Sequence, residues 1–222
     1  RAGVELLTTG DHVWDRKESP ELLETETRIV RPANYPPGTP GRGSTTLDVG
    51  DGVALGLLSL QGRVFMNPLD CPFRVGSDVV DGLLRETPVV VCDFHAEATS
   101  ETIALTRHLA GRASAVLGTH THVQTADDRI VAGHTAAITD VGMTGPSDSV
   151  IGMRTEVALD RFLKGRPRRY EVGGGPVVLS AVLLDVDGTL YDQRPLRVLM
   201  ALELCMLPVT KRSFSTAYNT WR

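Results

Sequence analysis

The chain has 222 residues, of which 41% are hydrophobic and 23% are charged, and its formal net charge is −4. These values are ordinary for a soluble globular protein of one or two domains, and the negative balance argues against a surface that coats nucleic acid. No stretch reaches the roughly 18 uninterrupted apolar residues of a membrane span, so we expect no membrane association. Three scattered cysteines without a CxxC spacing favour a reducing, cytoplasmic location.

The hydrophobic pattern alternates between strand-type and helix-type periods, which predicts an α/β fold. The elements expected are, in chain order, strand 4–9, helix 18–27, a hairpin of strands 45–49 and 53–60, helix 77–86, strand 88–93, helix 99–109, strands 113–118 and 136–139, helix 155–163, and strands 170–172 and 177–185. Residues 31–43 contain four prolines, which exclude a helix or a central strand. A loop this long that also carries Asn34 and an aromatic residue is expected to be ordered and to lie near the functional site.

Histidines follow two of the apolar runs at the point where each predicted strand ends. His95 ends the run Val-Val-Val-Cys-Asp-Phe-His, and His120 and His122 follow the run Ala-Val-Leu-Gly-Thr. His95 and His120 are separated by room for one helix, the spacing of a βαβ unit whose parallel strands are neighbours. Because ligands bind at the carboxyl ends of strands in open α/β sheets, the three imidazoles can converge on a metal ion.

A third junction, after the strand over 4–9, supplies Asp11 and His12. Asp11 offers an oxygen donor to the same metal site. His12 can remain off the metal and donate a proton to a leaving group, since the pKa of a free imidazole is about 6.5. Two metals in such a site would activate water and neutralise phosphate charge.

Other polar residues near these junctions have simpler alternatives. His108 and His134 are best interpreted as surface or hydrogen-bonded histidines. Asp93 and Glu97 flank His95 and are either outer partners of a ligand or solvated groups. Asp140 either orients a ligand histidine or forms a turn, and Asp11 alone would more often be a turn residue.

Several long motifs occur in the order found in one known family, the YmdB-like branch of the calcineurin-like metallophosphoesterases, which this chain resembles over residues 1–185. The motifs are Gly10-Asp11-His12-Val13-Trp14-Asp15, the Arg31–Gly43 loop, Asp93–Ser100, Gly118-Thr119-His120-Thr121-His122-Val123-Gln124-Thr125 and Thr139–Gly145. The resemblance implies a four-layer α/β/β/α sandwich. It also implies a two-metal phosphodiesterase, with iron or manganese, acting on cyclic nucleotides such as 2′,3′- or 3′,5′-cyclic AMP.

Residue roles follow from the resemblance by position. His95 and His120 would bind one ion together with position 11, and His122 would bind the other. His12 would be the catalytic histidine that contacts the phosphate and protonates the leaving oxygen. The substrate would be a small phosphodiester.

The chain departs from the family pattern at its beginning. The family has Asn at position 11, where this chain has Asp11, which can ligate but adds a charge that repels phosphate. The family's early strands carry an Asp ligand and the Glu that bridges the ions, and those strands should precede Arg1. We therefore expect a domain incomplete at its N-terminus that holds perhaps one metal, with weak or no activity. Unpaired sheet edges would also promote a homo-oligomer.

The end of the chain departs as well. Asp185-Val186-Asp187-Gly188-Thr189-Leu190-Tyr191 resembles the first motif of haloacid-dehalogenase-like phosphohydrolases, in which the first Asp is the nucleophile and the second the acid/base. We expect residues 186–222 to be an appended helical tail or a truncated second domain after a metallophosphoesterase domain over 1–185. Two rival functions follow: an aspartyl-phosphate phosphatase using Asp185 and Asp187, or a non-catalytic module that binds a nucleotide or a partner.

Overall fold

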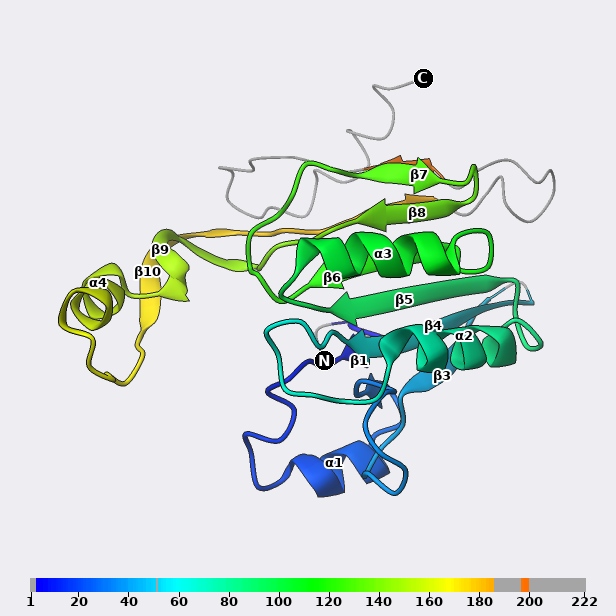
Figure 1. Ribbon diagram of the computed structural model, residues 1–222, viewed down its shortest axis with the longest axis horizontal. Helices are drawn as coiled ribbons and strands as arrows, with labels where there is room; N and C mark the ends of the chain where they lie inside the picture. Colours follow the sequence, from blue (N-terminus) through cyan, green and yellow to red (C-terminus); the bar gives the residue numbers. More distant parts are fainter. Residues whose placement is uncertain (1–2, 51, 186–196, 200–222) are drawn as a thin grey trace.

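A computed structural model describes residues 3–50, 52–185 and 197–199 (Figure 1). Its centre is a six-stranded sheet with strand order β3-β4-β5-β6-β8-β7. The strands are β3 (Ser44–Gly50), β4 (Val53–Gln61), β5 (Val89–His95), β6 (Ala115–Thr119), β7 (Arg129–Val131) and β8 (Thr135–Ile138). β4, β5, β6 and β8 run parallel, and the edge strands β3 and β7 run antiparallel to their neighbours. Four parallel strands therefore end at the same edge of the sheet.

Two helices cover one face of this sheet (Figure 1). They are α2 (Pro72–Leu83) and α3 (Thr99–Leu109), and α3 is the crossover of the βαβ unit expected between β5 and β6. The side chains that alternate toward this face form the main core, which includes Leu58, Leu60, Val90, Cys92, Phe94, Leu105 and Val116. The opposite face carries a smaller cluster around Val91, Ala115 and Ala136. The alternation assigns each strand residue to one face, which decides where the polar residues at the strand ends lie.

The remaining elements surround the sheet. β1 (Leu7–Thr8) and β2 (Ile29–Val30) form a short parallel pair, and α1 (Ser19–Thr25) connects them. β9 (Gly145–Met153) and β10 (Val172–Val178) form an antiparallel ribbon that carries α4 (Thr155–Lys164) between them. We call β9, α4 and β10 the arm, because they project away from the sheet (Figure 1). No helix in the described ranges is long and apolar enough to cross a bilayer.

The α/β prediction is confirmed, and most elements lie within a few residues of their expected bounds. The hairpin and the helix over 99–109 are found as expected. The helix predicted over 77–86 begins earlier, at Pro72, because proline suits the first turn of a helix, where its missing N–H has no intrahelical acceptor. Of the four layers expected, the described residues form the six-stranded sheet and its layer of α2 and α3, while β9 and β10 form a separate ribbon.

The helical tail is corrected where the structure describes it. Arg197–Leu199 form strand β12, which pairs antiparallel with β11 (Leu183–Asp185). The backbone groups along the edge of β11 offer hydrogen bonds that a strand can satisfy and a helix cannot. Asp187 and the other residues over 186–196 and 200–222 lie outside the described residues.

The proline-rich loop is ordered and joins the sheet edge, as predicted. Arg31 is buried and its guanidinium donates to the carbonyl oxygens of Pro32, Thr39, Pro40 and Gly41. Asn34, which is fully buried, donates from Nδ2 to the backbone carbonyl of Gln61 and accepts at Oδ1 from the backbone N–H of Gln61. The loop is thus tied to the carboxyl end of β4.

Candidate metal centre

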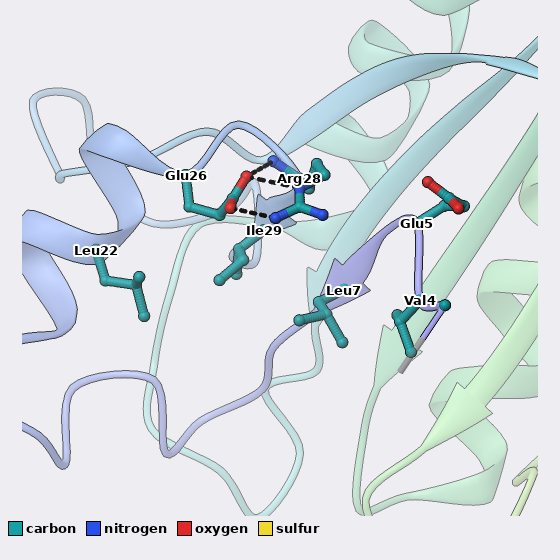
Figure 2. A pocket seen from close by; sticks show the side chains of 8 residues that line it. Val4, Glu5, Leu7, Leu22, Glu26, Arg28 and Ile29 are labelled. Carbon is teal, nitrogen blue, oxygen red and sulfur yellow. Dashed lines mark hydrogen bonds and ion pairs between the residues drawn. The ribbon is translucent and has the colours of Figure 1, made fainter. Parts of the chain in front are cut away.

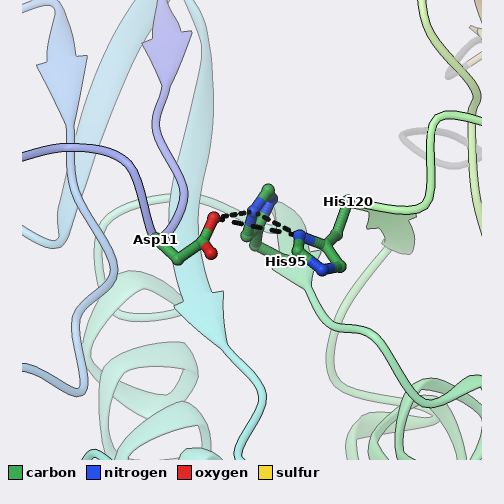
Figure 3. Close-up of side chains that lie close together, drawn as sticks. All are labelled: Asp11, His95 and His120. Atoms are coloured by element: carbon green, nitrogen blue, oxygen red, sulfur yellow. Dashed lines mark hydrogen bonds and ion pairs between the residues drawn. The ribbon is translucent and has the colours of Figure 1, made fainter. Parts of the chain in front are cut away.

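Three predicted ligands meet at the carboxyl edge of the sheet (Figure 3). His95 is the last residue of β5, His120 follows β6, and Asp11 follows β1. The Asp11 Oδ1 atom lies 2.9 Å from His95 Nε2 and 3.8 Å from His120 Nδ1. The two ring nitrogens are 3.1 Å apart. One donor atom from each residue therefore points into a common space, with all of them within 4.8 Å of one another.

Two glycines permit this convergence. A Cβ atom at Gly10 would lie 2.3 Å from the Nε2 atom of His95, so a larger residue would push the Asp11 turn away from the ring. A Cβ at Gly118 would lie 1.7 Å from the carbonyl oxygen of Thr139. The end of β6 can therefore pass close to the residue that follows β8 only because residue 118 has no side chain.

The two histidines of the Thr-His-Thr-His run have positive φ angles, 112° at His120 and 67° at His122. Such angles are uncommon outside glycine and occur where the surrounding structure holds a functional turn in place. Asp140 fixes this turn, because its Oδ2 atom accepts hydrogen bonds from both the backbone N–H and the hydroxyl of Thr121. Asp140 thus holds the loop between the histidines and, among the described residues, forms no hydrogen bond with either ring.

His122 lies apart from the three-residue group. Its Nδ1 atom is 3.1 Å from the carbonyl oxygen of Ile151 in β9. Because that hydrogen bond engages Nδ1, the free atom for a ligand would be Nε2. Its expected role as a ligand of a second ion remains a prediction.

The ligand rings have outer partners on their other nitrogens. His120 Nε2 lies 3.0 Å from Glu97 Oε2. His95 Nδ1 lies 3.1 Å from the hydroxyl of Thr119, and that hydroxyl donates to Asp93 Oδ1 at 2.8 Å. The sequence left Glu97 and Asp93 open as outer partners or solvated groups. In the structure both are outer partners of ligand histidines, Glu97 directly and Asp93 through Thr119. Thr119 is a residue that the sequence did not single out.

The protonation states favoured here suit a metal site. Burial lowers the pKa of His95, and the hydrogen bond with Asp11 opposes that shift only in part. Burial alone would raise the pKa of Asp11, but its hydrogen bond with His95 and the nearby histidine charges outweigh burial, so this pKa lies below its ordinary value. A neutral imidazole beside an ionised carboxylate is the state that binds a cation.

His12 lies beside the group, and its side chain is 81% exposed. Its Nδ1 atom is 3.0 Å from Asp15 Oδ2, and its Nε2 atom is 4.0 Å from Asp11 Oδ1. Asp15 orients the ring, so that Nε2 is the atom available to a bound molecule. The other two histidines do not join the site: His108 is hydrogen-bonded to Ser77 and to the carbonyl of Phe73, and His134 lies in the turn between β7 and β8.

Gln61 is a second residue that the sequence missed. It is fully buried at the end of β4, paired with His95 across the sheet, and its side chain lies on the face of His95 because Leu60 faces the main core. Neither atom of its carboxamide has a hydrogen-bond partner within the described residues. A buried, unpaired amide next to the ligand group fits a site that holds a further polar group.

The donor set fits a divalent cation. One carboxylate oxygen and two imidazole nitrogens are ligands that zinc, iron and manganese accept. Two ring nitrogens that face each other at 3.1 Å beside a carboxylate also leave lone pairs that a cation would satisfy. Asp11, His95 and His120 are therefore the residues that would hold a metal.

A pocket of about 350 Å³ lies elsewhere, between β1 and α1 (Figure 2). It is lined by Leu7, Leu22 and Ile29, and its polar edge is the ion pair of Arg28 with Glu26. The pocket shares no residue with the candidate ligand group. Its lining also includes the carboxylate of Glu5 but no histidine, so the metal centre, which combines a carboxylate with two imidazoles, is the better functional site.

Comparison with known proteins supports the same family as the motifs. The model of the YmdB-like protein family matches residues 1–195. A Bacillus subtilis protein named 2′,3′-cyclic-nucleotide 2′-phosphodiesterase is 48% identical over 187 residues, covering 84% of this chain and 70% of that protein. A hypothetical protein from Thermus thermophilus has a crystal structure that superimposes with a TM-score of 0.80 at 45% identity, over 90% of this chain and 77% of that one. A novel phosphatase from Mycoplasma pneumoniae matches with a TM-score of 0.72 at 33% identity, over 82% of this chain and 65% of that one.

Proposed function

Because the chain belongs to the YmdB-like family, we propose that it is a metal-dependent phosphodiesterase that hydrolyses cyclic nucleotide-type phosphodiesters. The observation that carries the proposal is the convergence of Asp11, His95 and His120 at the carboxyl edge of the sheet. The Bacillus relative, which bears the name of a cyclic-nucleotide phosphodiesterase, supports the substrate class. Iron or manganese is the metal we propose, with His122 as a ligand to a second ion.

The residues of the chain have separate tasks in this reaction. Asp11, His95 and His120 would hold the first ion, and a divalent cation there would neutralise phosphate charge and activate a water nucleophile. The water oxygen would form a bond to phosphorus and lose one proton to solvent as the bond from phosphorus to one ribose oxygen breaks. His12 would donate a proton to that leaving oxygen from Nε2 and regain one from solvent, while Asp15 holds Nδ1. The product is a nucleoside phosphomonoester.

The test combines metal content with turnover. Purified chain is loaded with manganese or iron and assayed on 2′,3′-cyclic AMP and on bis-p-nitrophenyl phosphate. Replacing Asp11, His95 or His120 by Ala should remove bound metal and the hydrolysis above background together. H12A should keep its metal and lose about 10²–10⁴-fold in rate, the usual contribution of general acid catalysis.

The matched control is His108→Ala, because His108 is a histidine of α3 whose partners are Ser77 and a backbone carbonyl. It should leave both metal content and rate unchanged. Turnover that is weak but above background is the expected result, and a metal-loaded chain that turns over neither substrate would overturn the proposed activity. Retention of metal by H95A and H120A would overturn the proposed site.

We also propose that residues 1–185 form the catalytic unit and that the motif at Asp185 has no part in it. D185N should then hydrolyse at the unaltered rate, while H120A should not. The reverse result would favour the aspartyl-phosphate phosphatase. Bound nucleotide without bound metal would favour the non-catalytic module.

A cytoplasmic location and self-association are further proposals. Cys71 and Cys92 are free thiols, as a reducing compartment favours. In α4, Phe162 and Leu163 are 78% and 82% exposed, which leaves apolar surface available for association. Cell fractionation tests the location, and light scattering coupled to gel filtration measures the mass in solution.

A further inference from the structure

Both nitrogens of the His95 ring are engaged, and they face different groups. Nε2 points at Asp11 and His120, at 2.9 Å and 3.1 Å. Nδ1 points away from them, at the hydroxyl of Thr119, 3.1 Å distant. A metal needs a lone pair on Nε2, so the ring can bind only when its proton is on Nδ1.

The hydroxyl of Thr119 has one proton to give, and its hydrogen bond to Asp93 Oδ1 at 2.8 Å uses it. Asp93 is 9% exposed, and as a carboxylate it can only accept. The Thr119 oxygen is then left with lone pairs alone, so it favours a ring proton on Nδ1, whereas Asp11 Oδ1 at 2.9 Å favours a proton on Nε2. A cation held by Asp11 and Nε2 would remove the second choice and leave the proton on Nδ1, where Thr119 accepts it.

The sheet register builds this arrangement. β5 and β6 run parallel with His95 opposite Thr119, so the two side chains are neighbours on the same face. Asp93 precedes His95 by two residues on β5 and therefore lies on that face too. All three groups are carried by adjacent hydrogen-bonded strands, and their spacing does not depend on a loop.

We propose that Thr119 and Asp93 are positioning residues that favour the Nδ1-protonated tautomer of His95 and thereby present the lone pair of Nε2 to the metal. The inference rests on the proposed metal site, and it adds to that site a relay through a hydroxyl. His120 reaches its outer carboxylate, Glu97, directly, and Glu97 is 49% exposed. The carboxylate of the His95 relay, Asp93, is buried, so it is the better shielded of the two carboxylates from exchange with water.

Three threonine variants test the relay. T119V keeps the shape of the side chain and removes the hydroxyl, and T119S keeps the hydroxyl. The control is T135V, because the hydroxyl of Thr135 is buried in the same sheet but bonds only to the backbone of Ala113 and Gly111. Circular dichroism establishes that each variant folds, and T119A is the second way to delete the hydroxyl if T119V does not fold.

Two measurements on these variants do not depend on turnover. The first is the Kd for zinc alone by calorimetry, which should weaken about 10–100-fold in T119V, the usual effect of losing an outer partner of a ligand. T119S and T135V should bind zinc as the unaltered chain does. The second is the ¹⁵N spectrum of the histidine rings without metal at mildly alkaline pH, in which the Nδ1–H fraction of His95 should be equal in the unaltered chain and in T119S and lower in T119V.

Three results would overturn the inference: zinc binding by T119V at unaltered affinity, equal losses in T119S and T119V, or an equal loss in T135V. Failure of the proposed function looks different. There, the unaltered chain binds zinc and depends on Thr119, but manganese- or iron-loaded protein hydrolyses no phosphodiester. That result would support the relay and contradict the proposed reaction.

Discussion

The carboxyl edge of the central sheet and the arm differ in which side chains they expose to solvent. At the edge, polar groups are held within the fold, as the buried Asp93 and its partner Thr119 show. On the arm, large apolar groups face solvent, with Leu163 82% exposed. The difference lies in strand pairing. Each of the strands β4, β5, β6 and β8 is paired on both sides within the six-stranded sheet, whereas β9 pairs with β10 in a two-stranded ribbon. Precise placement of ligand atoms therefore comes from the sheet.

The largest expected contrast is a leucine deletion made in one helix of each region. L105A removes a fully buried side chain from α3 and should lower the free energy of unfolding by about 2–5 kcal/mol. L163A in α4 removes a mostly exposed one and should change it by no more than about 0.5 kcal/mol. Urea unfolding at several protein concentrations measures both. A large, concentration-dependent loss in L163A would show that the arm is buried by association, and the contrast would fail.

A glycine pair sharpens the comparison at the level of single atoms. An alanine at Gly118 places its Cβ 1.7 Å from the carbonyl oxygen of Thr139, so the end of β6 must move away from the residue that follows β8. We expect a loss of about 1–3 kcal/mol and weaker metal binding, since His120 follows two residues later. Gly174, in β10, has nothing within 4 Å of its Cβ position, and G174A should be close to neutral. Thermal unfolding and zinc titration of both variants measure the stability and the metal affinity. A G118A variant with unaltered stability and zinc affinity would contradict the close approach.

The smallest expected effect concerns charge on the arm. Hydrogen bonds from Lys164 and then Arg168 hold the pKa of Asp160 below its ordinary value of 3.8. Because its pKa is lower in the folded state, Asp160 stabilises the fold fully at pH values above its ordinary pKa. This contribution disappears as the pH falls through the lowered pKa. The pairs are exposed, so salt should screen them and raise the pKa. NMR titration of the Asp160 carboxyl group at low and high salt measures its pKa. In the K164Q/R168Q double variant this pKa should not depend on salt. A salt-independent pKa in the unaltered chain would count against the pairing.

The sequence predicted the strand ends well because their signal is local. Apolar runs that stop at a histidine mark the end of a buried strand, and His95 and His120 lie where that pattern placed them. Within the arm, helix α4 was predicted to within one residue, whereas strand β9 was not predicted. β9 contains Gly145 and Pro146 and has no apolar alternation, so its pairing with β10 depends on a contact between distant residues that no local pattern reveals.

What the sequence determined by itself is the chemical inventory of the site: Asp11, His12, His95, His120 and His122, each placed after a predicted strand or in the turn that follows one. What only the tertiary structure decided is which of these meet and what stands behind them. The register of β5 against β6 brings Thr119 beside His95, and the turn at His122 directs that ring to the carbonyl of Ile151. Covalent order specifies which residues follow a strand, but distances between strands are set by backbone pairing and packing across the whole sheet.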